Sequence, residues 1–210
     1  DAEGATTVPY KLLRDLVKAC PSATVSLDCV PSDPAAKHPV DKLTVECARM
    51  TTVIDGRPAA DFPVMAEPPA DANWAEVHPA SFAAAGGYVA PCIATDDSRP
   101  VLTGIRLTAG PEGLTLASAD GFRLAIAECP SAYRYPLAGR WVVPQAFMAC
   151  VARLFGKETE PVELSVYLVR GCAYVTARTA DVTIAARTID ATFPNYADLI
   201  PDNPTKVTVD

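Results

Sequence analysis

One short pattern recurs three times along the chain, and its spacing limits the folds that the chain can adopt. Each copy has a valine shortly before a proline and a bulky apolar residue three positions after it. The three prolines are Pro9, Pro79 and Pro144, at intervals of about 70 and 65 residues. Self-similarity at a nearly fixed period is typical of repeated structural units. We therefore expect one supersecondary unit to be built three times.

Each proline is predicted to open a helix, because its missing N–H is not needed in the first helical turn. Apolar residues follow at helical spacing after two of the prolines, namely Leu12, Leu13, Leu16 and Val17, and then Phe147, Met148, Val151, Leu154 and Phe155. The second helix along the chain, predicted over 80–94 after Pro79, is rich in alanine but carries Gly86 and Gly87. Two glycines inside a helix weaken it.

Short strand-like runs separated by turn residues follow the helices. After the second proline they are 101–107, 114–118 and 123–127, and after the third they are 162–168, 172–177 and 182–187. Glycine, proline and aspartate divide these runs, as turns between antiparallel strands require. The sequence therefore predicts an α+β fold in which one helix and about three or four antiparallel strands form each unit.

A longer repeat indicates where domains begin and end. A Phe-Pro pair, Phe62-Pro63 and again Phe193-Pro194, follows two of the units. Residues 74–200 are thus predicted to form a complete two-unit domain, and residues 1–67 the second half of an equivalent one. The adjacent Pro68 and Pro69 suit a linker over 68–73, and residues 31–39 suit an enlarged hairpin loop. A half-domain leaves apolar surface unburied, so we expect its other half to lie outside this chain.

Composition restricts the function. The hydrophobic fraction of 50% permits a sizeable core. The sequence contains no run of about 18 apolar residues, so we expect no membrane span. The seven cysteines form no CxxC pair, so we expect buried, reduced thiols and no metal. The net charge of −7 argues against tight nucleic-acid binding, but not against a protein that surrounds DNA without gripping it.

Catalysis finds no support in the motifs. His38 and His78 are the only histidines, and neither belongs to a GxSxG or HExxH motif. No glycine-rich phosphate loop is present either. We therefore expect no catalytic residue and no cofactor.

Five motifs, in order, resemble the bacterial DNA sliding clamp, the β subunit of DNA polymerase III. They are residues 4–9 (GATTVP), 61–63 (DFP), 99–104 (RPVLTG), 119–124 (ADGFRL) and 193–196 (FPNY). The resemblance covers almost the whole chain. It implies the end of a first clamp domain, a complete second domain and, over 201–210, the start of the connection to a third. It also implies that helices lie on the inner face and sheets outside.

This resemblance also implies the function and the partners. The family forms a homodimeric ring around duplex DNA in the bacterial cytoplasm and does no chemistry. It tethers the polymerase III α subunit, and it also binds the clamp loader and other proteins that carry a clamp-binding motif. Tethering raises effective concentration, so a partner rebinds before it diffuses away.

Partners of the family insert a peptide between the second and third domains. Carried over by motif, the second-domain wall is Leu102, Ala119, Gly121, Phe122, Arg123, Leu124, Pro194 and Leu199. Glycine permits close approach of a ligand backbone, and apolar walls suit leucine and phenylalanine anchors. From the residues alone, an ordinary Asp-Gly hairpin turn beside core leucines explains the same pattern. Asp198 stands where the family often has a basic residue, which leaves the peptide preference open.

The residues predicted to face DNA are few. They are Lys11, Arg14 and Lys18 on the first helix, Arg99 in the loop after the second, and Arg153 on the third. A solvated helix face explains the first three equally well. Asp96 and Asp97 offset Arg99, so we expect weak, salt-sensitive contact with phosphates, independent of sequence. The alternative is a clamp-derived protein-binding module that does not encircle DNA, which the acidic composition favours.

Overall fold

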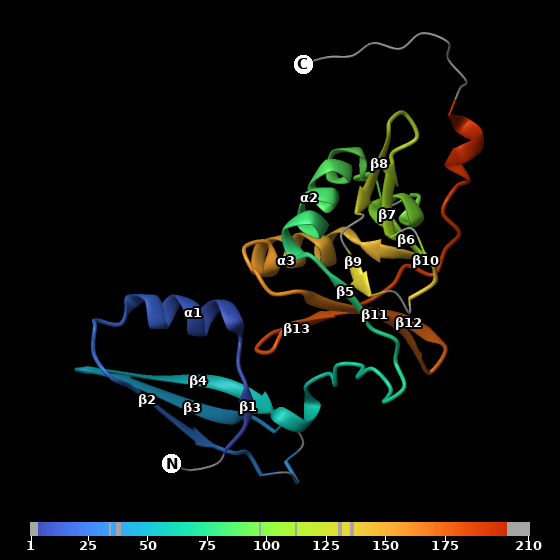
Figure 1. The fold of residues 1–210 in the computed structure, drawn as a ribbon. Coiled ribbons are helices and arrows are strands. Elements are labelled where there is room, and N and C mark those ends of the chain that lie inside the picture. Colours follow the sequence, from blue (N-terminus) through green and yellow to red (C-terminus); the bar gives the residue numbers. More distant parts are fainter. Residues whose placement is uncertain are drawn as a thin grey trace. The chain divides into compact units, whose positions relative to one another are not determined.

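A computed structural model describes residues 4–33, 35–36, 39–96, 98–111, 113–129, 132–134 and 137–200, without the side chains of 132–134 and of Leu199. His38, Asp97, the side chain of Leu199 and the expected connection over 201–210 therefore lie outside the described residues. The chain divides into two compact units, Asp1–Val64 and Met65–Asp210. Figure 1 shows the helices and strands of both units.

The first unit is one helix on one four-stranded sheet. Helix α1 (Tyr10–Ala19) follows β1 (Thr6–Thr7), and β2 (Val25–Val30), β3 (Asp41–Cys47) and β4 (Met50–Pro58) follow the helix. The sheet order is β1-β4-β3-β2, and all its pairs are antiparallel. A short 3-10 helix, η1 (Ala59–Asp61), ends the unit. The helix-plus-strands unit predicted after Pro9 is confirmed.

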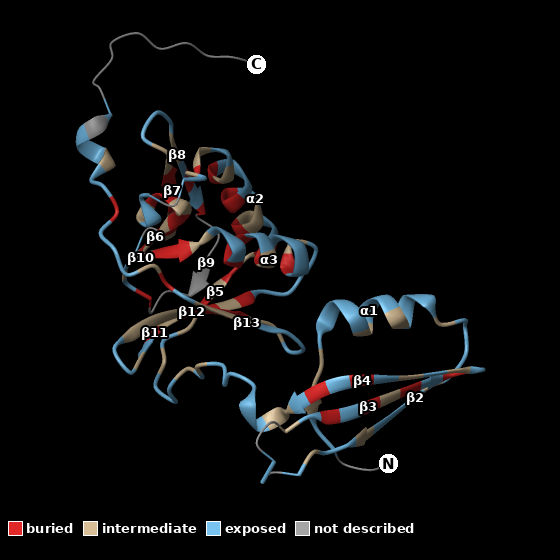
Figure 2. Cartoon of the chain, turned by 180° about the vertical axis from the view of Figure 1, so that it is seen from behind, coloured by how far each residue is buried: buried red, intermediate tan, exposed pale blue. Residues whose placement is uncertain are grey.

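Little of the first unit is buried. Its core consists of Leu43, Val45 and Ile54, against which Leu13 and Leu16 of α1 pack with half-buried side chains. No residue of α1 is fully buried, and exposed residues colour most of the helix in Figure 2. Large apolar side chains lie exposed on both layers, among them Leu12, Val17, Leu27, Val30 and Val53. Apolar side chains of this unit thus remain accessible on both layers.

The enlarged loop between β2 and β3 is fastened to the sheet by one buried carboxylate. The Asp41 side chain is only 2% exposed, and its Oδ1 accepts hydrogen bonds from the backbone N–H and the hydroxyl of Ser32, both at 2.8 Å. The Ser32 backbone N–H is the main cause that lowers the pKa of Asp41. The loop therefore begins at a fixed point.

The second unit holds two antiparallel sheets and two helices. The first sheet, in the order β10-β6-β7-β8, is built from β6 (Gly104–Gly110), β7 (Gly113–Ala119), β8 (Leu124–Cys129) and β10 (Gly139–Pro144). The second, in the order β13-β12-β11-β5-β9, is built from β5 (Ala75–Val77), β9 (Ala132–Arg134), β11 (Val162–Val169), β12 (Cys172–Arg178) and β13 (Thr183–Arg187). A strand is found at each predicted run, but the strand predicted from residue 101 begins only at Gly104, because Pro100–Thr103 form a 3-10 turn. Strands β5, β9 and β10 were not predicted.

Helices α2 (Pro79–Val89) and α3 (Gln145–Phe155) pack side by side over these sheets (Figure 1). A side-chain nitrogen of His78, Nδ1, accepts a hydrogen bond from the backbone N–H of Ser81 at 3.4 Å, so this histidine caps α2. The helix expected to reach residue 94 ends at Val89 and continues only as the 3-10 turn η2 (Ala90–Cys92), because Pro91 lacks an N–H.

The core of the second unit explains why two glycines remain helical. A Cβ on Gly86 would lie 2.7 Å from Cε of Met148, so glycine lets α2 approach α3 closely. Phe82, Val89, Phe147, Val151 and Phe155 of the two helices then interlock above strand residues such as Leu116 and Leu164. This packing offsets the weak helix propensity of α2.

The cysteines are all reduced thiols. None of the seven cysteines forms a disulfide, and only Cys47 and Cys129 are buried, so the expectation of buried thiols holds for two of them. Across the described residues, no helix has the length and apolar character needed to span a membrane.

Candidate functional site

The turn between β7 and β8 is fixed by the side chain of Asp120. Its Oδ1 accepts hydrogen bonds from the backbone N–H groups of Phe122 at 2.9 Å and of Arg123 at 2.8 Å. Its Oδ2 accepts from Nε and Nη2 of Arg123, at 2.9 and 2.6 Å. Gly121 has a φ of +94°, a conformation that side chains rarely adopt. Asp120 thus holds the turn and its arginine in one arrangement.

These bonds favour the ionised form of Asp120. The backbone N–H of Phe122, followed by the guanidinium of Arg123, lowers the pKa of Asp120 to about 2. The Asp120 carboxylate in turn raises the pKa of Arg123. The Arg123 guanidinium, predicted to meet peptide carbonyls, is therefore already held by a carboxylate, with its remaining N–H groups available.

The pH dependence of this turn gives a first prediction. A lowered pKa means that the ionised carboxylate stabilises the fold fully above its ordinary pKa of 3.8, and that this stabilisation is lost as pH falls towards 2. Asp120→Asn keeps an acceptor oxygen but removes the charge. We expect the variant to unfold at lower urea than the original chain at pH 7, and the gap to shrink between pH 4 and pH 2. A gap independent of pH would contradict the role of the carboxylate.

Arg99 belongs to this turn as well. A Cβ on Gly121 would lie 3.1 Å from Nη1 and 3.3 Å from Nη2 of Arg99, so the Arg99 guanidinium rests against the glycine. The sequence assigned Arg99 to DNA contact and did not connect it with the predicted pocket. In the structure, Arg99 and Arg123 place two guanidinium groups at one turn.

An apolar cluster brings most of the remaining pocket segments together. Leu102, Val142 and Phe193 are buried against one another, and Ala119, Ile189 and Tyr196 pack on them half-buried. The 3-10 turn η3 (Pro100–Thr103) positions Leu102, whose carbonyl accepts a hydrogen bond from the backbone N–H of Ala94 at 3.0 Å. Segments 99–104, 119–124 and 193–196, far apart in sequence, therefore meet.

The other predicted pocket residues differ in exposure. Phe122 is 96% exposed at the tip of the turn, Pro194 is exposed and Leu124 is half-buried. Leu199 ends η4 (Tyr196–Leu199). An exposed aromatic side chain and an exposed proline beside an apolar cluster are suited to contacts with a ligand.

Sequence reasoning missed three contributors to this site. Asp120 was seen only as a turn residue, although Asp followed by Gly-x-Arg signals a side chain that can cap the turn. Val142 lies in a separate repeat unit, and Tyr196 was quoted in a motif without a role. Nothing in the local sequence indicates that Val142 and Ile189 pack on Leu102.

The predicted DNA-facing residues lie in both units. Lys11, Arg14 and Lys18 are exposed on α1, where the Arg14 guanidinium binds Asp15 at 2.7 Å and lies 5.5 Å from the Tyr10 ring centroid. Arg153 is exposed on α3. Near Arg99, Asp96 accepts a hydrogen bond from the backbone N–H of Ser98 at 2.9 Å, and the serine hydroxyl is the main cause that lowers the pKa of Asp96.

Comparison with known proteins agrees with the fold. The family model for the DNA polymerase III beta subunit, central domain, matches residues 76–195. A β sliding clamp from Synechococcus elongatus is 28% identical over 205 residues (96% of this chain and 51% of that protein), and one from Caulobacter vibrioides is 28% identical over 216 residues (100% and 55%). The chain spans about half the length of such relatives.

Solved structures give the same result. The β sliding clamp of C. crescentus superposes with a TM-score of 0.82 at 27% identity, covering 98% of this chain and 53% of that one. The DNA polymerase III subunit β of Pseudomonas aeruginosa gives 0.77 at 25% identity, covering 95% and 52%. The resemblance and the α+β clamp fold predicted from the sequence are confirmed. The chain belongs to the DNA polymerase III beta subunit family.

Proposed function

We propose that this chain is the part of a DNA sliding clamp that carries one wall of a partner-binding pocket. The observation that carries the proposal is the meeting of Leu102, Ala119 and Phe193 beside the Asp120 turn. In this proposal the complete protein is a homodimeric, non-catalytic ring in the cytoplasm. It encircles duplex DNA and tethers the polymerase III α subunit, the clamp loader and other partners.

The pocket wall suits a short peptide with apolar anchors. Phe122, Leu124 and Pro194 supply accessible apolar surface, and Leu102 lies beneath them in the cluster. Arg99 and Arg123 present N–H groups that can donate to peptide carbonyls. Because Asp120 fixes the turn in advance, a peptide need not order it on binding, which lowers the entropic cost of association.

A peptide titration tests this pocket. The probe is a labelled peptide with a glutamine, then leucines and a final phenylalanine, added to the full-length gene product. We expect saturable binding, and loss of at least about tenfold in affinity for Gly121→Arg with Leu124→Ala, because the arginine strains the turn and the alanine removes apolar wall.

A matched pair of substitutions controls for general damage. Gly171 has a φ of +78° in the β11–β12 turn, and the nearby Leu168 is 70% exposed. Gly171→Arg with Leu168→Ala therefore imposes the same changes on another hairpin and should leave peptide affinity unchanged. Failure of the folded original protein to bind the peptide would refute the pocket assignment.

The acidic net charge and the few basic residues on the helices favour a second candidate function. This is a clamp-derived module that binds proteins without encircling DNA. The net charge is −7, helix α2 carries no basic residue, and Arg153 is the one basic residue of α3. Loading of the full-length gene product onto nicked circular DNA separates the two. Retention on circles and release on linearisation supports a ring, and peptide binding without retention supports the module.

A further inference from the structure

A second pocket lies where the two sheets of the second unit join. Edge strand β10 is bridged to the segment that follows β13. The bridge joins Val142 and Ile189, where the Ile189 N–H donates to the Val142 carbonyl at 2.8 Å. One residue earlier, Thr188 donates through its backbone N–H and its hydroxyl to the carbonyl of Ala173 on β12, at 2.9 and 3.1 Å. Segment 188–195 thus crosses the seam and lines one side of an open pocket of about 850 Å³.

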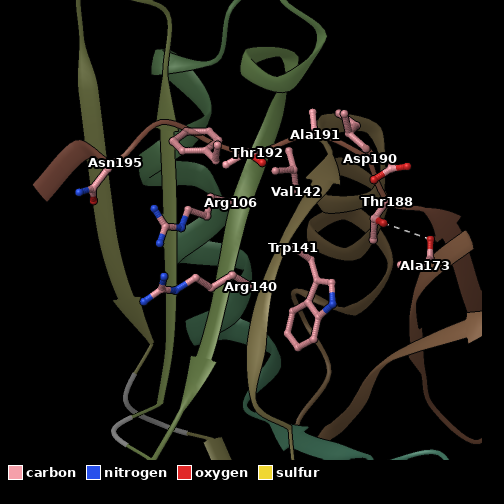
Figure 3. Close-up of a pocket in the computed structure, with 12 residues that line it drawn as sticks. Arg106, Arg140, Trp141, Val142, Ala173, Thr188, Asp190, Ala191, Thr192 and Asn195 are labelled. Atoms are coloured by element: carbon pink, nitrogen blue, oxygen red, sulfur yellow. Dashed lines mark hydrogen bonds between the residues drawn. The ribbon is translucent and has the colours of Figure 1, made fainter.

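Two arginines line one side of this cavity. In the antiparallel register Arg106 of β6 lies opposite Val142, and Arg140 of β10 lies opposite Thr108. The two arginines are therefore diagonal neighbours on one face of the sheet. Figure 3 shows their side chains projecting in the same direction, one beside the other.

Neither arginine is neutralised by an acid. Among the described residues, no carboxylate forms an ion pair with Arg106 or Arg140. Arg106 instead lies over the Tyr196 ring, 5.0 Å from its centroid. In a chain whose net charge is −7, two adjacent guanidinium groups without a carboxylate form a local positive site. Their mutual repulsion is relieved when an anion binds both.

The opposite side of the cavity has different chemistry. Trp141 follows Arg140 on β10 and pairs with buried Leu107, so its indole lies on the other face of the sheet, where it packs half-buried against the core. Thr188 and Asp190 lie away from the arginines (Figure 3). The cavity thus offers guanidinium donors and a carboxylate acceptor.

We propose that this cavity, the seam pocket, binds an acidic peptide segment of a protein partner. Carboxylates of the segment pair with Arg106 and Arg140, and its backbone N–H groups donate to Asp190. The volume lies within the range of about 300 to 1,000 Å³ that is usual for ligand pockets. Duplex DNA fits less well, because Asp190 repels phosphate.

The seam pocket is separate from the Asp120 turn, although Val142 and Phe193 contribute to both. The Arg106–Tyr196 contact connects the seam pocket to η4. A partner could therefore place its apolar anchors at the Asp120 turn and an acidic flank in the seam pocket. The binding of the acidic segment does not require the first site to be occupied.

The test uses the 210-residue chain and a short labelled peptide of glutamates around a central leucine. We expect saturable binding that weakens at high salt, and an affinity lower by at least about tenfold for Arg106→Gln with Arg140→Gln. Exposed Arg49 and Arg170 lie outside the pocket, so Arg49→Gln with Arg170→Gln controls for net charge and should bind as the original chain does. Arg140→Gln alone, at an exposed position, serves if the double variant fails to fold.

Tryptophan fluorescence locates the peptide. Trp74 and Trp141 are the only tryptophans, so in a Trp74→Phe background a change on peptide addition reports Trp141. Equal binding of the double variant, or of a peptide with glutamines in place of glutamates, would overturn the proposal. Displacement of the peptide by duplex DNA, abolished by the same arginine substitutions, would assign the seam pocket to nucleic acid instead. Retained acidic-peptide binding in Gly121→Arg with Leu124→Ala separates this result from the proposed function.

Discussion

Replacing Phe82 by alanine is expected to lower the free energy of unfolding of the second unit by about 3 to 5 kcal/mol. Phe82 is 1% exposed and is one of the largest fully buried side chains. It points from α2 into the core shared with α3 and both sheets. Removing the ring forfeits its burial and leaves a cavity that the surrounding side chains fill only in part.

Urea unfolding monitored by tryptophan fluorescence measures this loss. Both tryptophans lie in the second unit, so their signal follows that unit. Tyr88→Ala is the control, because this aromatic residue of the same helix is 75% exposed and should change stability by less than about 0.5 kcal/mol. Equal effects of the two substitutions would show that α2 is not anchored by Phe82.

The second large effect is expected at Gly104, where β6 begins. A Cβ there would lie 2.7 Å from Cγ1 of Val142, 2.8 Å from Cδ1 of Ile189 and 2.8 Å from the carbonyl oxygen of Val143. The carbonyl is backbone of the paired strand and cannot move aside as a flexible side chain does. We expect Gly104→Val to cost about 1 to 3 kcal/mol by overpacking.

The consequences of Gly104→Val should extend to both proposed sites. Moving Val142 and Ile189 disturbs the cluster below Leu102 and the bridge that closes the seam pocket. Gly110→Val is the matched control at the other end of β6, where a Cβ meets nothing within 4 Å. A loss of stability at Gly110 equal to that at Gly104 would contradict the overpacking argument. Peptide binding by the folded Gly104 variant with undiminished affinity would show that the cluster does not shape the sites.

The sequence predicted the repeated unit well because its signals are local. Pro9, Pro79 and Pro144 each stand at or directly before the first residue of a helix. The glycine and aspartate turns separate antiparallel strands where expected. Helix α2 is the instructive exception, since Gly86 and Gly87 argue against a helix locally. The approach of Met148, which Gly86 permits, became visible only in the packed core.

The sequence identified individual residues of the candidate site, but not the contacts between them. Leu102 and Ala119 were identified by motif, and the structure places them in one cluster with Phe193. The contact of Arg99 with Gly121 and the pairing of Arg123 with Asp120 were not anticipated. The seam pocket was not predicted at all, because Arg140 lies on β10, a strand that was not predicted.

The sequence by itself determined the three helices, most of the strands that follow them, the α+β class and the family, because each depends on nearby residues or on motifs along one chain. Tertiary structure alone decided which strands became neighbours. Strand register brings Arg106 beside Arg140, and chain crossing brings Ile189 to Val142. The energies that select such pairings arise between residues far apart in sequence, through burial and interstrand hydrogen bonds. The periodicity of the sequence therefore does not indicate which strands pair.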